Sequence, residues 1–228
     1  MGLSGRRDVL AAPQETVHGI SPTLLELIRA EGVAQKNVLD VGCGEGRLGL
    51  AIAPEARWVI GLDRDPAAIA RAELAARERG IANIELVVAD AETTDYRTLR
   101  RPIQMVVAHL CMSDAIIARA AEAIGRGAPL VFAAFHTDQW KETGKISRFA
   151  YSQDRLCRVL EDAGFSVEAL EVERRVKEFA SEGEALLVLV DLRPKWEADG
   201  RWANYLAYLR AGGRELTRSH ILVKARRR

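Results

Sequence analysis

Short apolar runs alternate with amphipathic segments along most of the chain. Five runs rich in Val, Ile and Leu predict strands over residues 38–41, 58–62, 84–89, 103–110 and 129–135. Strands that are apolar along most of their length, rather than at every second position, are typical of parallel sheets with both faces covered. Because helical segments separate these runs, the pattern predicts an α/β fold with a doubly wound sheet.

Helix signals fill the gaps between the apolar runs. Ser21 followed by Pro22 suits an N-cap and a first turn, so we expect a helix to begin there and lead into the first strand. A second helix should follow Pro66 and end near Gly80. Small and apolar residues along one side of this second helix predict its buried face: Ala67, Ile69, Ala70, Leu74 and Ala75.

Two more strands complete the expected sheet. Residues 166–176 alternate between polar and apolar types and follow a predicted helix over 154–163, and residues 219–228 combine a last strand with a basic tail. The sequence therefore predicts a mostly parallel sheet of seven strands with helices on both faces.

A helical insertion is expected between the last two strands. Ser181 and Glu184 have the spacing of a capping box, so we expect a helix over 185–192 although several of its residues favour strands. Another helix should follow from about Gly200. Residues 181–213 then form an insertion that carries four aromatic side chains, Trp196, Trp202, Tyr205 and Tyr208. We expect this stripe to pack onto the sheet, with a lid over the ligand as the alternative.

Composition and charge set limits on the class of protein. A length of 228 residues suits a single domain, with an N-terminal segment and helix over 1–37 and a ligand-binding core over 38–175. The formal net charge of +1 requires no polyanionic partner. No secretory or membrane-spanning segment is apparent, so a cytoplasmic protein is expected. Three widely spaced cysteines predict free thiols and no metal site.

The glycine-rich stretch VLDVGCGEGRLG, residues 38–49, follows the first predicted strand of the core and indicates a ligand. The dinucleotide pattern G-x-G-x-x-G fails when it starts at Gly42, and from Gly44 it begins two residues too late. The stretch is better described as an acidic residue, Asp40, followed by glycines at alternate positions. Glycines permit positive φ and close backbone approach, and a carboxylate suits a cationic amino group better than a diphosphate.

Asp40-Val-Gly42-Cys-Gly44-Glu-Gly46 resembles the D-x-G-x-G-x-G bend of the class I S-adenosylmethionine-dependent methyltransferases. The resemblance covers roughly residues 22–175 and implies a Rossmann-like fold with S-adenosylmethionine as the cofactor. It implies that Asp40 and the three glycines, Gly42, Gly44 and Gly46, lie beneath the methionine part of this cofactor.

Two further acidic residues fall at the ends of the next two strands. The resemblance implies that Asp63 accepts hydrogen bonds from both ribose hydroxyls, with Arg64 beside the adenine. It also implies that Asp90 accepts from the adenine amino group while the backbone amide of Ala91 meets a ring nitrogen. All these positions would lie at the carboxyl edge of the sheet, where open α/β sheets bind ligands.

Candidate catalytic residues follow the fourth and fifth strands. His109 and His136 have the side chain that suits a general base at neutral pH, with a packed and hydrogen-bonded histidine as the alternative for each. Cys111 is expected to be an unreactive packing residue rather than a nucleophile, because no proline precedes it as in a Pro-Cys motif. His18 is expected in a capping or surface role, although the N-terminal segments of this family often fold over the cofactor.

The acceptor of the methyl group is the least determined part of the sequence-based prediction. The loop after the fourth strand lacks the Asn/Asp-Pro-Pro-Tyr/Phe motif that similar enzymes use for planar amino groups, so methylation of exocyclic adenine nitrogen is not expected. The basic tail, with Lys141, Lys145 and Arg148, raises the alternative of RNA. We expect a methyltransferase that acts on an O, N or C atom of a small molecule. A non-catalytic module that binds S-adenosylmethionine and an NAD-dependent oxidoreductase are the competing hypotheses.

Overall fold

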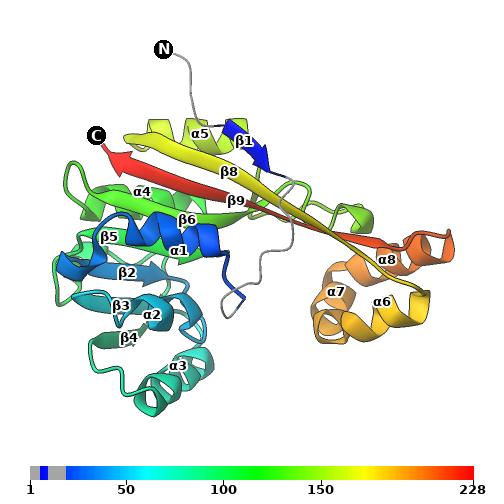
Figure 1. The fold of residues 1–228 in the computed structure, drawn as a ribbon, viewed down its shortest axis with the longest axis horizontal. Helices are drawn as coiled ribbons and strands as arrows, with labels where there is room; N and C mark the ends of the chain where they lie inside the picture. The colour runs from blue at the N-terminus through cyan, green and yellow to red at the C-terminus, as the bar shows by residue number, and fades with distance from the viewer. Residues whose placement is uncertain (1–5, 10–18) are drawn as a thin grey trace.

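The computed structural model describes residues 6–9 and 19–228 (Figure 1). Within these residues, nine strands form one mixed sheet in the order β1-β8-β9-β6-β5-β2-β3-β4, and β7 pairs with the end of β6. The strands are β1 (Arg6–Val9), β2 (Asn37–Val41), β3 (Trp58–Asp63), β4 (Ile84–Val88), β5 (Met105–His109), β6 (Pro129–His136), β7 (Ala150–Tyr151), β8 (Phe165–Glu178) and β9 (Glu215–Arg227).

All seven predicted strands are present, and the two additional strands are short. β9 is antiparallel to both of its neighbours, β6 and β8, whereas the other pairs are parallel. β1 has the sequence RRDV, which contains a single apolar residue and so gave no strand signal. β9 begins at Glu215, earlier than the predicted start at residue 219, because its first residues continue to pair with β8 beyond the end of β6.

Helices cover both faces of the sheet, as predicted (Figure 1). Buried residues of α1 and α2 pack on one face, and those of α4 and α5 pack on the other. The helices and short 3-10 turns before β8 are α1 (Pro22–Arg29), η1 (Val33–Gln35), α2 (Arg47–Ile52), α3 (Pro66–Glu78), η2 (Tyr96–Thr98), α4 (Asp114–Ala123), η3 (Lys141–Thr143) and α5 (Gln153–Asp162).

The start of α1 was predicted correctly, whereas Ile69 is the one residue of the predicted buried face of α3 that is buried. The hydroxyl of Ser21 accepts a hydrogen bond from the amide of Leu24, as an N-cap does. On α3 the buried residues are Ala68, Ile69, Ala72 and Ala76, and Leu74 is 50% exposed. Alanine and charged residues dominate this helix, so it has no strong apolar stripe, and its small-residue face is the one that approaches the glycine loop at Ala72.

The predicted insertion forms a separate helical lobe that comprises α6 (Glu182–Val188), η4 (Val190–Leu192), α7 (Arg193–Asp199) and α8 (Arg201–Arg210). The hydroxyl of Ser181 accepts from the amide of Glu184, which confirms the capped helix start. That helix ends at Val188 instead of continuing to residue 192, and α7 was not predicted.

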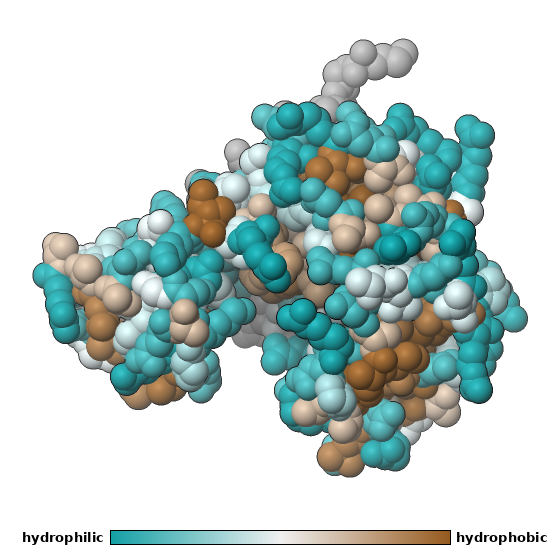
Figure 2. All heavy atoms as spheres, turned by 180° about the vertical axis from the view of Figure 1, so that it is seen from behind, coloured by the Kyte–Doolittle hydropathy of each residue, from teal (hydrophilic) through white to brown (hydrophobic). Residues whose placement is uncertain are grey.

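The expectation that the aromatic stripe of this lobe packs onto the sheet was wrong. Trp196 is fully buried in a separate core that the lobe forms with Leu216 at the start of β9, with Trp202 and Tyr205 at ring-centroid distances of 6.5 and 5.7 Å. The reason is that β8 and β9 pair as far as Glu178 and Glu215, which carries the insertion past the sheet. The lobe therefore stands off from the body, as the space-filling view also shows (Figures 1 and 2).

The topology brings the functional residues to one edge. Strands β2 to β6 and β8 run in the same direction, so their carboxyl ends meet at one edge of the sheet, from which the ribbon of β8 and β9 also emerges. Ligands of open α/β sheets bind at this edge. Among the described residues, no helix combines the length and apolar character that crossing a membrane requires.

Candidate cofactor-binding site

The glycines of the loop after β2 all have positive φ, but each is needed for a different reason. Gly42, Gly44 and Gly46 have φ values of 63°, 53° and 78°. A Cβ atom on Gly42 would lie 2.0 Å from the sulfur of Cys111, and one on Gly46 would lie 3.1 Å from Cβ of Ala72. A Cβ on Gly44 would meet nothing within 4 Å. Gly42 and Gly46 therefore allow close packing, and Gly44 exposes backbone to open space.

Asp40 is buried beneath this loop with half of its carboxylate unsatisfied. Its Oδ2 accepts a hydrogen bond from the amide of Gly49 at 2.9 Å, and its buried Oδ1 has no partner among the described residues. Burial raises the pKa of Asp40 to about 7, the Gly49 amide opposes this rise, and the nearby charge of Asp63 adds to it. An unpaired buried carboxylate oxygen is costly unless a donor or a cation meets it.

Asp63, at the end of β3, connects that strand to the glycine loop. Its Oδ2 accepts from the amide of Gly44 at 2.7 Å, and its Oδ1 accepts from the amide of Asp65 at 2.9 Å. Asp65, rather than Asp63, caps α3 by accepting from Ala67. Each oxygen of Asp63 therefore retains acceptor capacity for a further donor, such as a hydroxyl group.

Two adjoining clefts at the carboxyl edge share Gly42. The first, with an empty volume of about 640 Å³, is lined by Asp63, Arg64, Asp90 and Ala91 from the predicted set. The second is lined by Asp40, Gly44 and His109. Apart from Gly46, whose role is packing, the structure thus brings all predicted cofactor-binding residues to one continuous region. Sequence reasoning did not find further lining residues of the first cleft: Glu92, Leu110, Met112, Ile116 and Phe149.

The ends of β4 and β5 shape the first cleft. Asp90 accepts from the amide of Glu92 at 2.8 Å, and the carbonyl of Ala91 accepts from the buried hydroxyl of Tyr96 at 2.6 Å. Leu110 has a φ of 60°, which is rare for a residue with a branched side chain, and its amide donates to the carbonyl of Ala133. Such backbone conformations concentrate at functional sites, which agrees with the position of Leu110 in the cleft wall.

The two candidate histidines have different environments. His109 lines the second cleft, where burial and then the charge of Arg47 lower its pKa to about 4. His136 lines neither cleft; its Nδ1 accepts from the amide of Asp138 at 3.2 Å and lies 3.1 Å from the hydroxyl of Ser219. The structure therefore does not bring the two together, and only His109 faces the region of the cofactor. His18 lies outside the described residues.

The cysteines behave as predicted. Cys43, Cys111 and Cys157 are all free thiols. Cys111 packs against Gly42 and lines the first cleft, and burial raises the pKa of its thiol to about 11, which favours the protonated thiol at neutral pH.

Comparison with known proteins decides the family. Residues 33–185, more than half of the chain, match the methyltransferase domain family. The chain belongs to the class I S-adenosylmethionine-dependent methyltransferases. S-adenosylmethionine is therefore its cofactor, and the hypothesis of an NAD-dependent oxidoreductase is excluded. The unsatisfied Oδ1 of Asp40 and the open space at Gly44 fit the amino group and backbone of a methionine moiety.

Curated relatives match this methyltransferase over part of their length. The 2-heptyl-1-hydroxyquinolin-4(1H)-one methyltransferase of Mycobacteroides abscessus is 39% identical over 80 residues, which are 35% of each chain. The ubiquinone biosynthesis O-methyltransferase of Histophilus somni is 42% identical over 67 residues, which are 28% of each chain. The matched segment thus spans about a third of these relatives.

Solved structures match this methyltransferase over most of its length. A putative methyltransferase from Bacillus halodurans has 20% identity and a TM-score of 0.67, with 90% of this chain and 99% of that chain covered. The magnesium protoporphyrin IX methyltransferase of Synechocystis, solved with bound S-adenosylhomocysteine, has 16% identity and a TM-score of 0.57, with 90% and 80% covered. At these identities the likeness shows the fold, which is the predicted Rossmann-like one.

Proposed function

We propose that this protein transfers a methyl group from S-adenosylmethionine to a hydroxyl oxygen of a small organic molecule. The observation that carries the proposal is the pair of clefts that meet at Gly42, one lined by Asp40 and the other by Asp63 and Asp90. The residues of both clefts would together hold the cofactor. We infer that the sheet and the helical lobe act as one domain, because β8 and β9 run through both.

Different residues of the two clefts bind different parts of the cofactor. Asp40 meets the cationic amino group with its free oxygen, and Asp63 accepts from the two ribose hydroxyls. Asp90 and the amide of Ala91 recognise the adenine edge, with Arg64 beside it. When bound, S-adenosylmethionine supplies a methyl group on a positively charged sulfur, and the acceptor oxygen displaces that sulfur in line.

The environment of His109 favours an acceptor with an acidic hydroxyl group. A pKa of about 4 leaves its imidazole neutral at pH 7 and makes it a weak base for an alcohol or a phenol, whose own pKa is roughly 10 or higher. We infer that His109 accepts a hydrogen bond and orients the hydroxyl. The acceptor then has to ionise by itself, as phenols and N-hydroxy compounds do more readily than alcohols.

Two observations support a small molecule over RNA. The relatives named above are methyltransferases for a hydroxyquinolinone and in ubiquinone biosynthesis. The basic tail is engaged within the fold: Lys224 and Arg226 form ion pairs with Glu31 and Glu168, and Arg227 donates to the carbonyl of Gly164. These charges therefore stabilise β9 and are not free for phosphates.

The test is calorimetric titration with S-adenosylmethionine, S-adenosylhomocysteine and NADH in parallel, followed by transfer of labelled methyl groups to a panel of phenols, N-hydroxy heterocycles and alcohols. We expect both sulfur ligands to bind, NADH not to bind, and phenols or N-hydroxy compounds to be labelled. Binding without labelling of any acceptor would favour a cofactor-sensing module, and binding of neither sulfur ligand would refute the proposal.

A further inference from the structure

The segment of residues 145–149, between η3 and β7, forms a wall shared by the cofactor cleft and the hollow next to it. Phe149 lines both spaces and is 37% exposed, and Ile146 is 66% exposed. Ser113, at the start of α4, also lines both. An apolar surface beside the place assigned to the cofactor is the feature expected where an organic acceptor binds.

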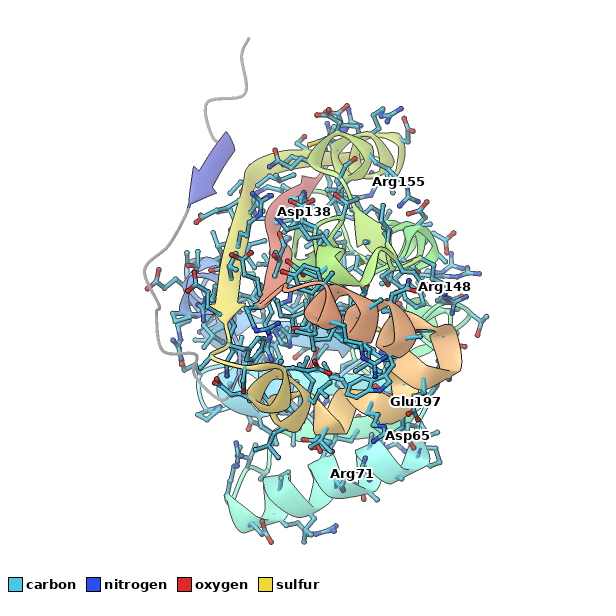
Figure 3. All side chains as sticks on the ribbon, turned by 90° about the vertical axis from the view of Figure 1, so that its right-hand side faces the viewer. Asp65, Arg71, Asp138, Arg148, Arg155 and Glu197 are labelled. Atoms are coloured by element: carbon cyan, nitrogen blue, oxygen red, sulfur yellow. The ribbon has the colours of Figure 1, made fainter. Side chains whose placement is uncertain are left out.

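Arg148 carries an uncompensated charge on this wall. Its guanidinium carbon lies 4.3 Å above the ring of Phe149, and in the described part of the chain no carboxylate lies within ion-pair distance of it. Arg155 lies on the same flank of the molecule as Arg148 (Figure 3). It differs because it pairs with Asp114 at 2.7 Å. Asp114 also accepts a hydrogen bond from the hydroxyl of Tyr151 at 2.6 Å, so both of its carboxylate oxygens already have partners.

Two carboxylates and two guanidinium groups line the hollow: Glu92, Asp114, Arg148 and Arg155. Asp114 and Arg155 pair with each other, so their charges compensate. Arg148 lines the same hollow as Glu92 without forming an ion pair with it, so its guanidinium remains available to a bound anion. Stacking on Phe149 holds the guanidinium plane of Arg148 in place, and a planar guanidinium binds a carboxylate with two parallel hydrogen bonds.

The helical lobe fixes the position of this segment. The side-chain amide of Asn204 on α8 donates to the carbonyl of Thr143 at 2.8 Å, and the ammonium group of Lys145 donates to the carbonyl of Asp199. Trp140, just before η3, has a φ of 58° and contacts Trp196 of the lobe at a ring-centroid distance of 5.2 Å. The lobe lines neither cofactor cleft. It affects the position of residues 145–149 through its contacts with η3 and Lys145.

We propose that Arg148 and Phe149 recognise the acceptor, and that the acceptor is a planar aromatic acid whose carboxylate pairs with Arg148 and whose ring packs on Phe149. This inference rests on the proposed function, because it assumes that the cofactor lies in the adjoining cleft. Arg148 sets specificity in this scheme and takes no part in the chemical step.

The test measures binding of two probes that differ only in charge. 1-Hydroxy-2-naphthoate and its neutral amide, 1-hydroxy-2-naphthamide, are titrated into the full chain saturated with S-adenosylhomocysteine. We expect the acid to bind about tenfold more tightly than the amide, the gain typical of one charge-assisted bidentate pair. Arg148→Gln should abolish this preference without changing the affinity for the amide or for S-adenosylhomocysteine, and Arg148→Lys should restore part of it.

Two further variants separate charge from packing. Arg126→Gln removes the same charge from an exposed turn that follows the C-terminal end of α4, whose N-terminal end lines the clefts, and it should retain the full preference. Phe149→Ala should weaken both probes, because both stack on the ring, and the acid more than the amide, because Arg148 loses the ring that holds its guanidinium. Equal binding of the two probes to the unmodified protein, binding of neither, or a preference that survives Arg148→Gln would overturn the inference. Failure of S-adenosylhomocysteine to bind would instead remove the proposed function itself.

Discussion

The cofactor side and the acceptor side of the carboxyl edge are held together by different kinds of contact. On the cofactor side, the carboxylates of Asp40 and Asp63 accept hydrogen bonds from the amides of Gly49 and Gly44, so backbone is fixed to buried or half-buried acids. On the acceptor side, contacts with a lobe that is remote in sequence hold the start of the segment of residues 145–149 and the turn before it. Asn204 donates to the carbonyl of Thr143, and Lys145 donates to the carbonyl of Asp199.

This difference implies that cofactor affinity and acceptor selectivity are separable. Substitutions on the cofactor side should change affinity for S-adenosylhomocysteine, and substitutions in the lobe should change acceptor preference alone. Sites tied to rigid elements by backbone contacts tolerate little change, whereas a wall held by surface side chains tolerates more. The following substitutions test that division, beginning with the largest expected effect.

Asp63→Ala should lower affinity for S-adenosylhomocysteine at least about a hundredfold, because the acceptor for two hydroxyls and the link to Gly44 disappear together. Calorimetry measures the affinity. Asp65→Ala is the matched control: it removes the cap of α3, costs about 1 kcal/mol of stability and leaves affinity nearly unchanged. Similar losses of affinity in both variants would mean that Asp63 acts only through the local backbone.

Gly42→Ala should destabilise the protein more than Gly44→Ala. Both positions have positive φ, so both substitutions carry a backbone cost of roughly 1 kcal/mol. Only the Cβ at residue 42 would collide with the sulfur of Cys111, which adds about 1–3 kcal/mol of overpacking. Thermal unfolding measures the difference. Equal destabilisation would show that Cys111 moves away freely and that Gly42 is not a packing residue.

Asp40→Asn should weaken cofactor binding about tenfold at pH 8, because the unpaired oxygen that meets the cationic amino group loses its charge. In the unmodified protein, affinity should rise as pH passes through the Asp40 pKa of about 7. Asp40→Asn should flatten this rise. An unchanged pH profile would place the amino group elsewhere.

The same substitution has the opposite effect on the stability of the ligand-free protein. Burial raises the pKa of Asp40 from 3.8 to about 7. Its contribution to stability is therefore complete below about pH 4 and is lost as pH rises through 7. Asp40→Asn does not ionise, so the difference between its melting temperature and that of the unmodified protein should shift in its favour by a few degrees between pH 4 and pH 8.

The sequence predicted that three acidic residues would meet at one edge of the sheet, because its signals are local. Asp40 lies near the end of an apolar run, Asp63 and Asp90 each follow one, and parallel strands place such residues at one edge. The rule of strand ends is enough to bring them together without knowledge of any side-chain contact.

The acceptor side could not be predicted because long-range packing determines it. The aromatic residues around Trp196 have the same helical spacing whether they pack on the sheet or in a separate core. Only the length over which β8 and β9 pair determines which of the two packings forms. His136 follows a strand just as His109 does, yet contacts with Asp138 and Ser219 occupy it. Arg148 stands next to Phe149 in a loop with no motif.

Asn204→Ala tests the role of the lobe and should have the smallest effect. Loss of the hydrogen bond to Thr143 should loosen the segment that carries Arg148 and reduce the preference for the naphthoate over the amide two- to fivefold, about 0.4–1 kcal/mol. Affinity for S-adenosylhomocysteine should stay the same.

Asn83→Ala is the matched control for this substitution, because Asn83 donates to the carbonyls of Ala53 and Ala56 at the opposite end of the sheet. It should lower the melting temperature without altering the preference. Asn204→Ala could leave the preference for the naphthoate intact while Arg148→Gln removes it. In that case β7 and α5 alone position the segment that carries Arg148, and acceptor selectivity does not depend on the lobe. If Asn204→Ala instead lowers the affinity for S-adenosylhomocysteine, cofactor binding and acceptor binding are coupled. The two functions are then not separable by the kind of contact that holds each side.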